Sequence, residues 1–248
     1  MTDIAPAADR LTAPPADRTI LVLGSKPVPS LPPPGSFAAV ACANASGFSA
    51  RAHGLPAPRF TVVSAVLGSG KASDRHSLLA MRGLAAGTVY FLPRPLPHGD
   101  AWRRLRFRLR HWRLQAPWVR LLLRWHGLRW DRFVARPTGA YDSLLLELGD
   151  GAPEIAALMA TKRPSTGLVT LALGLTEAGF DHAILAGFDF TLSHAYGHNP
   201  LIDERGSASS KHADTDIGIL CAIETRRGGL WTSEPAVHAR TGIPLLPG

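Results

Sequence analysis

The chain has 248 residues, of which 46% are hydrophobic and 19% are charged, and a formal net charge of +8. A chain of this length hides roughly 70–75% of its unfolded surface and can bury one sizeable core. The composition excludes collagen, coiled coil and whole-chain disorder, and no continuous apolar run reaches the ~18 residues of a spanning helix. Two cysteines are too few for a disulfide framework, and the first residues lack the features of a secretory signal. We therefore expect one cytoplasmic domain.

The positive charge is concentrated between Trp102 and Arg136. This segment holds eleven arginines, one acidic residue (Asp131) and five of the six tryptophans. Removing it from the 27 basic and 19 acidic residues of the chain leaves 16 and 18, so the remainder is close to neutral. Arginine mixed with tryptophan and leucine is typical of a surface at a membrane interface, whereas nucleic-acid domains spread their cations over a broad face.

The first half of the chain predicts a tail followed by alternating strands and helices. Residues 1–18, rich in Ala, Pro and Asp, predict a flexible tail before a single domain at 19–248. Short apolar runs, some closed by glycine, predict buried strands. These strands lie at 20–23, 37–42, 60–65 and 88–92, with a helix over 73–86 between the last two.

The second half continues this alternation after a basic helical insertion expected at 101–136. Proline at a first turn and glycine after a last turn help to place the later helices. They are predicted at 153–161, 166–178 and 214–225, with a strand at 182–186. Strands that alternate with helices predict a Rossmann-like α/β fold, a mostly parallel sheet with helices on both faces. In such sheets ligands bind beyond the carboxyl ends of the strands.

Two glycine-containing loops follow predicted strands. The first is Gly24, Ser25 and Lys26, whose backbone amides either bind a phosphate or form an ordinary turn. The second, residues 68–71, resembles the end of a P-loop. However, Ala65 stands where the first glycine is required, and Ala72 replaces the hydroxyl that binds magnesium. These two departures exclude a P-loop nucleoside triphosphatase.

A third candidate precedes the most apolar predicted helix. Its residues combine cations, hydroxyls and a helix N-terminus, all of which favour an anion: Lys162, Arg163, Ser165, Thr166 and Gly167. The alternative interpretation is a helix cap with solvated basic neighbours.

The order of these features resembles that of bacterial sialyltransferases that use CMP-activated sugars, and of relatives that transfer other ulosonic acids such as Kdo. The resemblance rests on motifs within residues 20–47 and 161–224, including the turn Gly187–Phe190. It implies a CMP-sugar site, and we expect no cofactor besides this donor substrate. The residues that it places at the nucleotide-sugar site are Gly24, Ser25, Lys26, Asn44, Ser64, Arg163, Ser165, Thr166, Gly167, Asp189 and Tyr196.

The chain departs from the family pattern at several positions. The family's Gly-x-Gly-Pro-Ser is stretched over Gly24–Ser30, and Ser64 stands where members often carry an asparagine. Of two tyrosines that hold the leaving phosphate, the first is replaced by Thr191, and Tyr196 is the candidate for the second. The catalytic histidine corresponds to His212, one residue closer to its helix than usual.

The chemistry of the resemblance assigns roles to these side chains. The donor loses its phosphate as leaving group while a base removes a proton from the acceptor hydroxyl. His212 is the candidate base, because imidazole with a pKa of about 6.5 accepts a proton at neutral pH. Ser165, Thr166 and Tyr196 are expected to donate hydrogen bonds to the phosphate, and Arg163 to balance its charge. The alternative for His212 is a solvated histidine before a helix.

Two metal sites are also considered. Asp214 and Asp216 form an Asp-x-Asp pair, which chelates Mg²⁺ or Mn²⁺ in many glycosyltransferases. Here the pair opens a predicted helix, where acids usually complement the helix dipole. His194, His198 and His212 have a spacing that suits zinc, but the first two lie in a segment of Ser, Gly, Asn and Pro without a rigid frame. We expect neither metal.

The arginine and tryptophan segment has two interpretations. Leu105, Leu109 and Trp112, and likewise Leu121, Leu122 and Trp125, have helical spacings, so the tryptophans could fill a core beneath a solvated face. Eleven arginines with one acid instead favour contact with an anionic membrane, an acidic glycan acceptor or a partner protein. The residues expected on this surface are Arg103, Arg106, Arg110, Trp112, Arg113 and Trp118.

The sequence therefore predicts an inverting, metal-independent glycosyltransferase that moves an ulosonic acid from CMP to a hydroxyl of a bacterial surface glycan. Its expected place is the inner face of the cytoplasmic membrane. A second hypothesis is a non-catalytic membrane- or glycan-binding protein that retains the fold. A third, nucleic-acid binding through the arginines, predicts an affinity that falls steeply with salt.

Overall fold

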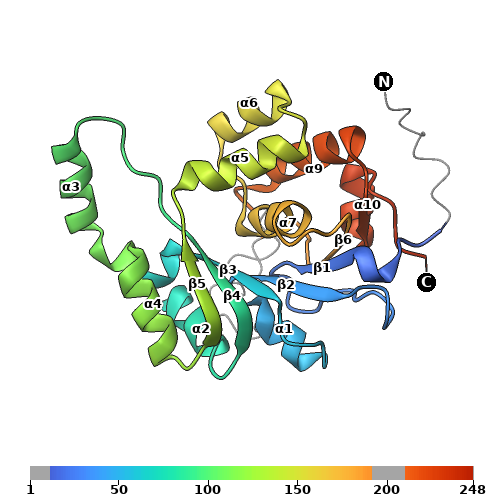
Figure 1. Ribbon diagram of the computed structural model, residues 1–248, viewed down its shortest axis with the longest axis horizontal. Coiled ribbons are helices and arrows are strands. Elements are labelled where there is room, and N and C mark those ends of the chain that lie inside the picture. The colour runs from blue at the N-terminus through green and yellow to red at the C-terminus, as the bar shows by residue number, and fades with distance from the viewer. Residues whose placement is uncertain (1–11, 192–209, 248) are drawn as a thin grey trace.

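The computed structural model describes residues 12–191 and 210–247. One sheet of seven strands, all parallel, runs through the molecule in the order β5-β4-β3-β2-β1-β6-β7 (Figure 1). The strands are β1 (Thr19–Leu23), β2 (Ala39–Ala43), β3 (Phe60–Ser64), β4 (Ala85–Leu92), β5 (Arg129–Ala135), β6 (His182–Ala186) and β7 (Leu230–Thr232). The predicted Rossmann-like α/β fold is confirmed.

The order in which the chain adds strands to the sheet reverses beside β1. From β1 it adds strands outward to β5, and it then returns to place β6 on the other side of β1. Thr19 is paired with His182 and Leu23 with Ala186, so the two strands end together. Ligands of open α/β sheets bind where such a reversal leaves a crevice between the loops that follow adjacent strands. The topology therefore directs attention to the loops after β1 and β6.

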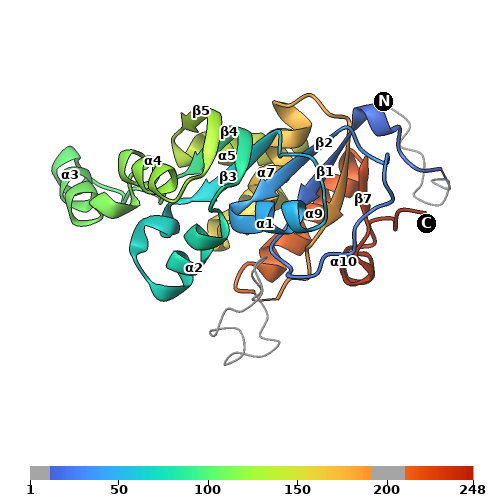
Figure 2. The ribbon, with the colours of Figure 1, turned by 90° about the horizontal axis from the view of Figure 1, so that it is seen from below.

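Helices cover both faces of the sheet (Figures 1 and 2). One face carries α5 (Thr138–Leu148), α6 (Pro153–Thr161), α7 (Thr166–Thr176), α9 (Ala213–Arg226) and α10 (Pro235–Thr241). The other carries α1 (Gly47–Ala52), α2 (Ala72–Ala80) and α4 (Ala116–Trp125). Side chains of β1 alternate between the two, since Ile20 packs in the cluster of α7 and Leu21 in that of α1. Burial on both faces explains why β1 reads as a continuous apolar run.

Short 3₁₀ helices and one exposed helix complete the described chain. They are η2 (Ala16–Arg18), η3 (Asn44–Ser46), η4 (Ala65–Ser69), η5 (Trp112–Leu114) and α3 (Ala101–Arg110). Part of the predicted tail is thus ordered against the domain, because the Thr19 hydroxyl donates to the Pro15 carbonyl at 2.7 Å. None of the helices in residues 12–191 and 210–247 combines the length and apolarity needed to cross a bilayer.

The basic segment 101–136 is not helical throughout, and this prediction was wrong at its end. Residues Arg129–Ala135 form β5, the strand at one edge of the sheet, with Ala85 of β4 paired to Arg129. Charged side chains on an edge strand protect its open hydrogen-bonding groups from pairing with other chains. Because Arg129, Asp131 and Arg132 are charged, the segment lacks the apolar run from which a strand would be predicted.

Candidate functional site

The loops after β1 and β6 are in direct backbone contact. The Gly24 N–H donates to the Ala186 carbonyl at 2.8 Å, and the Lys26 N–H donates to the Gly187 carbonyl at 2.9 Å. A Cβ at Gly24 would lie 2.3 Å from the Gly187 carbonyl oxygen, so only glycine permits this approach. The predicted glycine turn thus lies at the reversal point of the sheet.

This contact makes Gly24→Ala a severe substitution. The added methyl would meet the backbone carbonyl of Gly187, which cannot move aside as a flexible side chain can. We expect a loss of about 1–3 kcal/mol in the free energy of unfolding, measured by urea denaturation. Gly139→Ala is the control, because it lies in α5 with open space around it, and should be neutral or slightly stabilising. Equal stability of the two variants would contradict the close contact.

The N-terminus of α7 packs against the same turn. A Cβ at Gly167 would lie 2.6 Å from the Phe188 ring, which brings the first turn of α7 against the residues after β6. The Ser165 hydroxyl caps the helix by accepting the Leu168 N–H at 3.4 Å. The first turn of a helix leaves N–H groups without partners in the helix and has a positive dipole end. Thr166 and Gly167, in this first turn, therefore place backbone N–H groups beside the β1 and β6 loops.

His212 lies against the loop that leads into α7. Its Nδ1 is 2.7 Å from the carbonyl oxygen of Arg163. Because a carbonyl only accepts, Nδ1 carries the proton, and Nε2 is the nitrogen of the neutral ring that can accept one. Burial lowers the pKa of His212 below its ordinary value; the Arg163 hydrogen bond opposes this, and the charges of Lys211, Lys162 and Arg163 add to it. The ring is therefore neutral at pH 7 and suited to accept a proton.

Asp216 joins the start of α9 to the start of α7. Its Oδ1 accepts the Ser165 N–H at 2.9 Å, and the residue is 5% exposed. Burial raises the pKa of Asp216 to about 6, against the opposing effect of the Ser165 hydrogen bonds. One member of the Asp-x-Asp pair is thus engaged by the protein backbone. Within residues 12–191 and 210–247, no cluster of three or more His, Cys, Asp or Glu is arranged to hold a metal; His194 and His198 lie outside these ranges.

The raised pKa of Asp216 predicts a pH-dependent effect on stability. Its folded pKa of about 6 exceeds the ~3.9 of an unfolded aspartate, so ionisation destabilises the fold as pH rises through this interval. Asp216→Asn keeps an acceptor for Ser165 and removes the charge. We expect the stability of this variant relative to the unsubstituted protein to rise by about 2–3 kcal/mol between pH 4 and pH 7. Urea denaturation across this range tests it, with the exposed Asp214→Asn as control; a pH-independent difference would contradict the assignment.

A residue that the sequence analysis missed ties the loops together. Glu234 follows β7, and its side chain is fully buried. Its Oε1 accepts the N–H of Ser30 at 2.8 Å and that of Gly187 at 2.9 Å, and its Oε2 accepts from Lys26 Nζ at 2.5 Å. The available signal was an acid two residues after the short run Leu230–Thr232, at the carboxyl end of a strand. Its partners lie up to 208 positions away in the chain, so spacing alone could not identify them.

Asn44 and Ser64 are brought together at the ends of β2 and β3. The Asn44 Oδ1 accepts the Ser64 N–H at 2.9 Å, and Asn44 has a positive φ of 51°. Asparagine tolerates this left-handed conformation better than most residues. Nearby, the Ser46 hydroxyl donates to the Leu23 carbonyl at 2.9 Å and joins this loop to the end of β1. These two predicted residues thus lie together at the carboxyl ends of β2 and β3.

Other predicted site residues have partners within the protein. Arg163 Nη2 is 3.6 Å from Asp142 Oδ1 of α5, so its guanidinium already has a counter-charge. Asp189 accepts the N–H of Thr191 at 3.0 Å and its hydroxyl at 2.7 Å. Ser25 is half-buried next to Gly24. Tyr196 lies outside the described residues.

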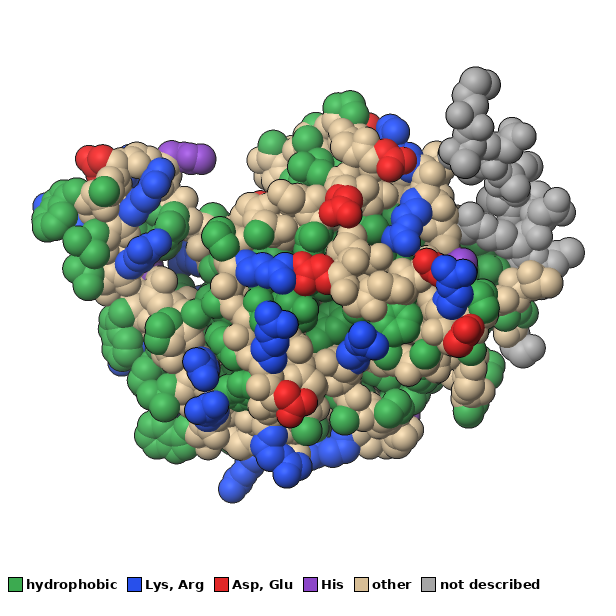
Figure 3. Space-filling model, in the orientation of Figure 1, with side chains coloured by type: hydrophobic (Ala, Val, Ile, Leu, Met, Phe, Trp, Pro, Cys, Tyr) green, Lys and Arg blue, Asp and Glu red, His purple; other side chains and the backbone are tan. Residues whose placement is uncertain are grey.

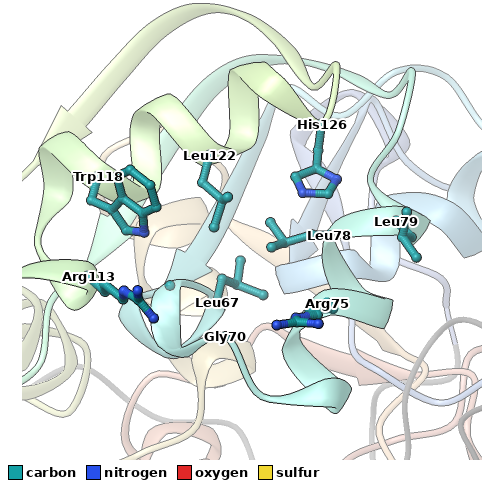
Figure 4. Close-up of a pocket in the computed structure, with 10 residues that line it drawn as sticks. Leu67, Gly70, Arg75, Leu78, Leu79, Arg113, Trp118, Leu122 and His126 are labelled. Carbon is teal, nitrogen blue, oxygen red and sulfur yellow. The ribbon is translucent and has the colours of Figure 1, made fainter.

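A separate cavity of about 330 Å³ lies between η4, α2 and α4 (Figure 4). Leu67, Leu78 and Leu122 face its interior, with Arg113 and Arg75 at opposite ends. Trp118 also lines it, so two residues of the predicted basic surface, Arg113 and Trp118, border this cavity. None of its lining residues belongs to the loops that meet at Gly24 and Gly187.

Comparisons with known proteins were made for sequence and structure. No protein-family model matches the chain, and no curated protein has a significantly similar sequence. The sialyltransferase CstII from Campylobacter jejuni, solved with cytidine-5'-monophosphate, matches with a TM-score of 0.53 and 15% identity, over 94% of this chain and 86% of CstII. CstII with CMP-3FNeuAc gives 0.52 and 15%, over 93% and 87%. The α-2,3-sialyltransferase Cst-I of the same organism gives 0.53 and 12%, over 93% and 80%. The chain shares its fold with these sialyltransferases.

Proposed function

We propose that the protein is a glycosyltransferase that transfers an ulosonic acid from CMP to a hydroxyl of a bacterial glycan. One observation carries the proposal: the loops after β1 and β6 and the N-terminus of α7 meet at the reversal point of the sheet, in the fold of sialyltransferases solved with CMP. Another CstII structure contains a trisaccharide acceptor together with CMP. A nucleotide-sugar donor and a glycan acceptor are therefore the substrates that we propose.

The reaction is a single displacement. His212 Nε2 takes the proton of the acceptor hydroxyl as its oxygen bonds to the anomeric carbon of the donor. The bond from that carbon to the phosphate oxygen breaks, its electron pair stays on the phosphate, and CMP leaves. Attack opposite the leaving group inverts the anomeric configuration. The Arg163 carbonyl holds the ring through Nδ1, so Nε2 is the nitrogen available for this proton.

Negative charge develops on the departing phosphate and must be stabilised. We assign this to the N–H groups of the first turn of α7 and to the Ser165 and Thr166 hydroxyls, with Lys162 and Lys211 as nearby cations. We propose that these groups act without a metal ion. Sialic acid and Kdo carry the same nucleotide, so both are candidate donors.

A turnover assay tests the proposal. CMP release and transfer to an oligosaccharide panel should be detected by mass spectrometry with CMP-sialic acid or CMP-Kdo, and not with UDP-galactose. Activity should persist in EDTA, and NMR of the product should show an inverted anomeric centre. Loss of activity in EDTA would contradict metal independence, and transfer from UDP-galactose alone would contradict the CMP assignment.

Two contacts favour a second candidate, a binding protein that retains the fold without turnover. The Arg163 guanidinium is paired with Asp142, and the Thr191 hydroxyl, at the position of a family tyrosine, donates to Asp189. In such a protein His212→Ala would leave glycan or CMP binding intact with no turnover to lose. Detectable turnover by the unsubstituted protein decides against it.

A further inference from the structure

Two helices and the turn between them form an arm at one end of the molecule. Here the arm means α3, η5 and α4, which lie together at the same end in both ribbon views (Figures 1 and 2). It leaves the sheet after Leu92 of β4, on the side of the sheet where the strands have their carboxyl ends. The candidate site lies on this same side. No residue of α3 is buried, so this helix does not contribute to the core.

Large apolar side chains lie exposed along the outer side of the arm (Figure 3). Trp102, Leu105 and Leu109 share one face of α3 by their spacing and are 59%, 44% and 65% exposed. On α4, Trp125 is 79% exposed, whereas Val119 and Leu123 point into the core. The sequence interpretation in which these tryptophans fill the core is therefore wrong for Trp102, Trp112 and Trp125. Large apolar side chains exposed together on one face of a helix, as on α3, indicate an interaction site.

The arginines of the arm have no acidic partner among residues 12–191 and 210–247. Among the described residues, none of the arginines from Arg103 to Arg132 forms an ion pair. Several stack on aromatic rings instead, with Arg106 5.1 Å from the Trp102 centroid and Arg113 5.3 Å from that of Trp112. Free cations around an apolar strip suit a partner that is both anionic and apolar, which an anionic bilayer surface is. A duplex nucleic acid would match the charge and leave the apolar strip in water.

We propose that the arm rests on an anionic phospholipid surface, with Trp102, Leu105, Leu109 and Trp125 in the interface and the arginines at the headgroups. Tryptophan is enriched at this depth of a bilayer, where its ring is amphipathic. The Trp112 and Trp118 rings, 4.9 Å apart, connect η5 to α4 and help to hold the arm's shape. The attachment is independent of the glycosyltransferase assignment. It would place the carboxyl edge of the sheet near a lipid-linked acceptor.

Vesicle flotation with the full chain tests this proposal. Vesicles of phosphatidylcholine with 30% phosphatidylglycerol should carry the protein upward at 0.1 M NaCl, and vesicles of pure phosphatidylcholine should not. Replacing Arg103, Arg106 and Arg110 together by Gln should weaken partitioning about 100-fold, because each cation near the surface contributes roughly five-fold. Replacing Arg51, Arg82 and Arg227 by Gln changes the net charge equally and should have a much smaller effect.

A second set of variants separates apolar insertion from charge. Trp102→Ser, Leu105→Ser and Leu109→Ser together should abolish flotation without lowering the melting temperature, since all three side chains are exposed. Val28→Ser, Val66→Ser and Leu245→Ser remove exposed apolar groups elsewhere and should leave flotation unchanged. Three results would overturn the proposal. One is equal flotation of the Trp102/Leu105/Leu109 variant and the Val28/Val66/Leu245 variant. The others are binding to a 20-base-pair RNA duplex without vesicles, and a dimer that the Trp102/Leu105/Leu109 substitutions convert to a monomer in sedimentation.

Discussion

His212→Ala is expected to lower turnover of a CMP-ulosonic donor by about 100- to 10,000-fold, the usual range for a general base, with little change in CMP affinity. The structure gives the reason, since the Arg163 carbonyl fixes the ring through Nδ1 and leaves Nε2 as the acceptor. His238 is a matched control, because its Nδ1 lies 2.8 Å from the Ile243 carbonyl in an equivalent contact on α10. His238→Ala should retain turnover. Equal losses in both variants would assign His212 a structural role.

The pH dependence of turnover has a defined direction for the same residue. Burial holds the pKa of His212 below its ordinary value of about 6.5, so protonation removes the base only in more acidic solution. The acidic limb of kcat/KM should therefore lie below pH 6.5. Residual activity of His212→Ala should lack this limb. A limb above pH 7 would exclude His212 as its origin.

Glu234→Ala is expected to lower the free energy of unfolding by about 3–4 kcal/mol, within the range measured when one partner of a buried ion pair is removed. The substitution leaves the Ser30 and Gly187 N–H groups and the Lys26 ammonium without their acceptor. These groups belong to the loops that meet at the reversal point. CMP affinity should consequently fall at least about ten-fold, which corresponds to 1.4 kcal/mol.

Two further variants identify the cause of that loss. Glu234→Gln retains an oxygen that can accept both N–H groups and should recover part of the stability. Glu154→Ala breaks an exposed pair with Arg226 and should lower the stability far less, because solvent screens such pairs. Urea denaturation and calorimetric titration with CMP measure both effects. Glu234→Ala as stable as Glu154→Ala would show that the buried carboxylate does not hold the loops.

The sequence was most informative where local burial determines the pattern. β6 and α6 begin and end at the predicted residues, 182–186 and 153–161, because apolar runs closed by glycine and an initial proline mark their limits. β5 escaped prediction because it is an exposed edge strand with charges on its open side, and β7 because three residues carry too little periodicity. Only tertiary packing gives these segments their strand conformation.

The candidate site likewise contains residues that the sequence identifies and one, Glu234, that only the fold identifies. Gly24, Asn44, Ser165 and His212 were selected from local signals or from the family order, and the structure places them at loops along one edge of the sheet. Glu234 was not selected, because its partners depend on β7 lying beside β6 and β6 beside β1. Strand order of this kind is a property of the whole fold. The spacing of residues along one sequence does not directly give the order of strands in the sheet.

Calorimetric titration of CMP into the unsubstituted protein tests the central claim most directly. If the β1 and β6 loops and the α7 N-terminus grip one cytidine monophosphate, the titration will show one saturable site per chain. Glu234→Ala will then weaken it, and AMP will not compete. Absence of CMP binding by the folded protein, or equal binding of AMP and CMP, would contradict the assignment of this site.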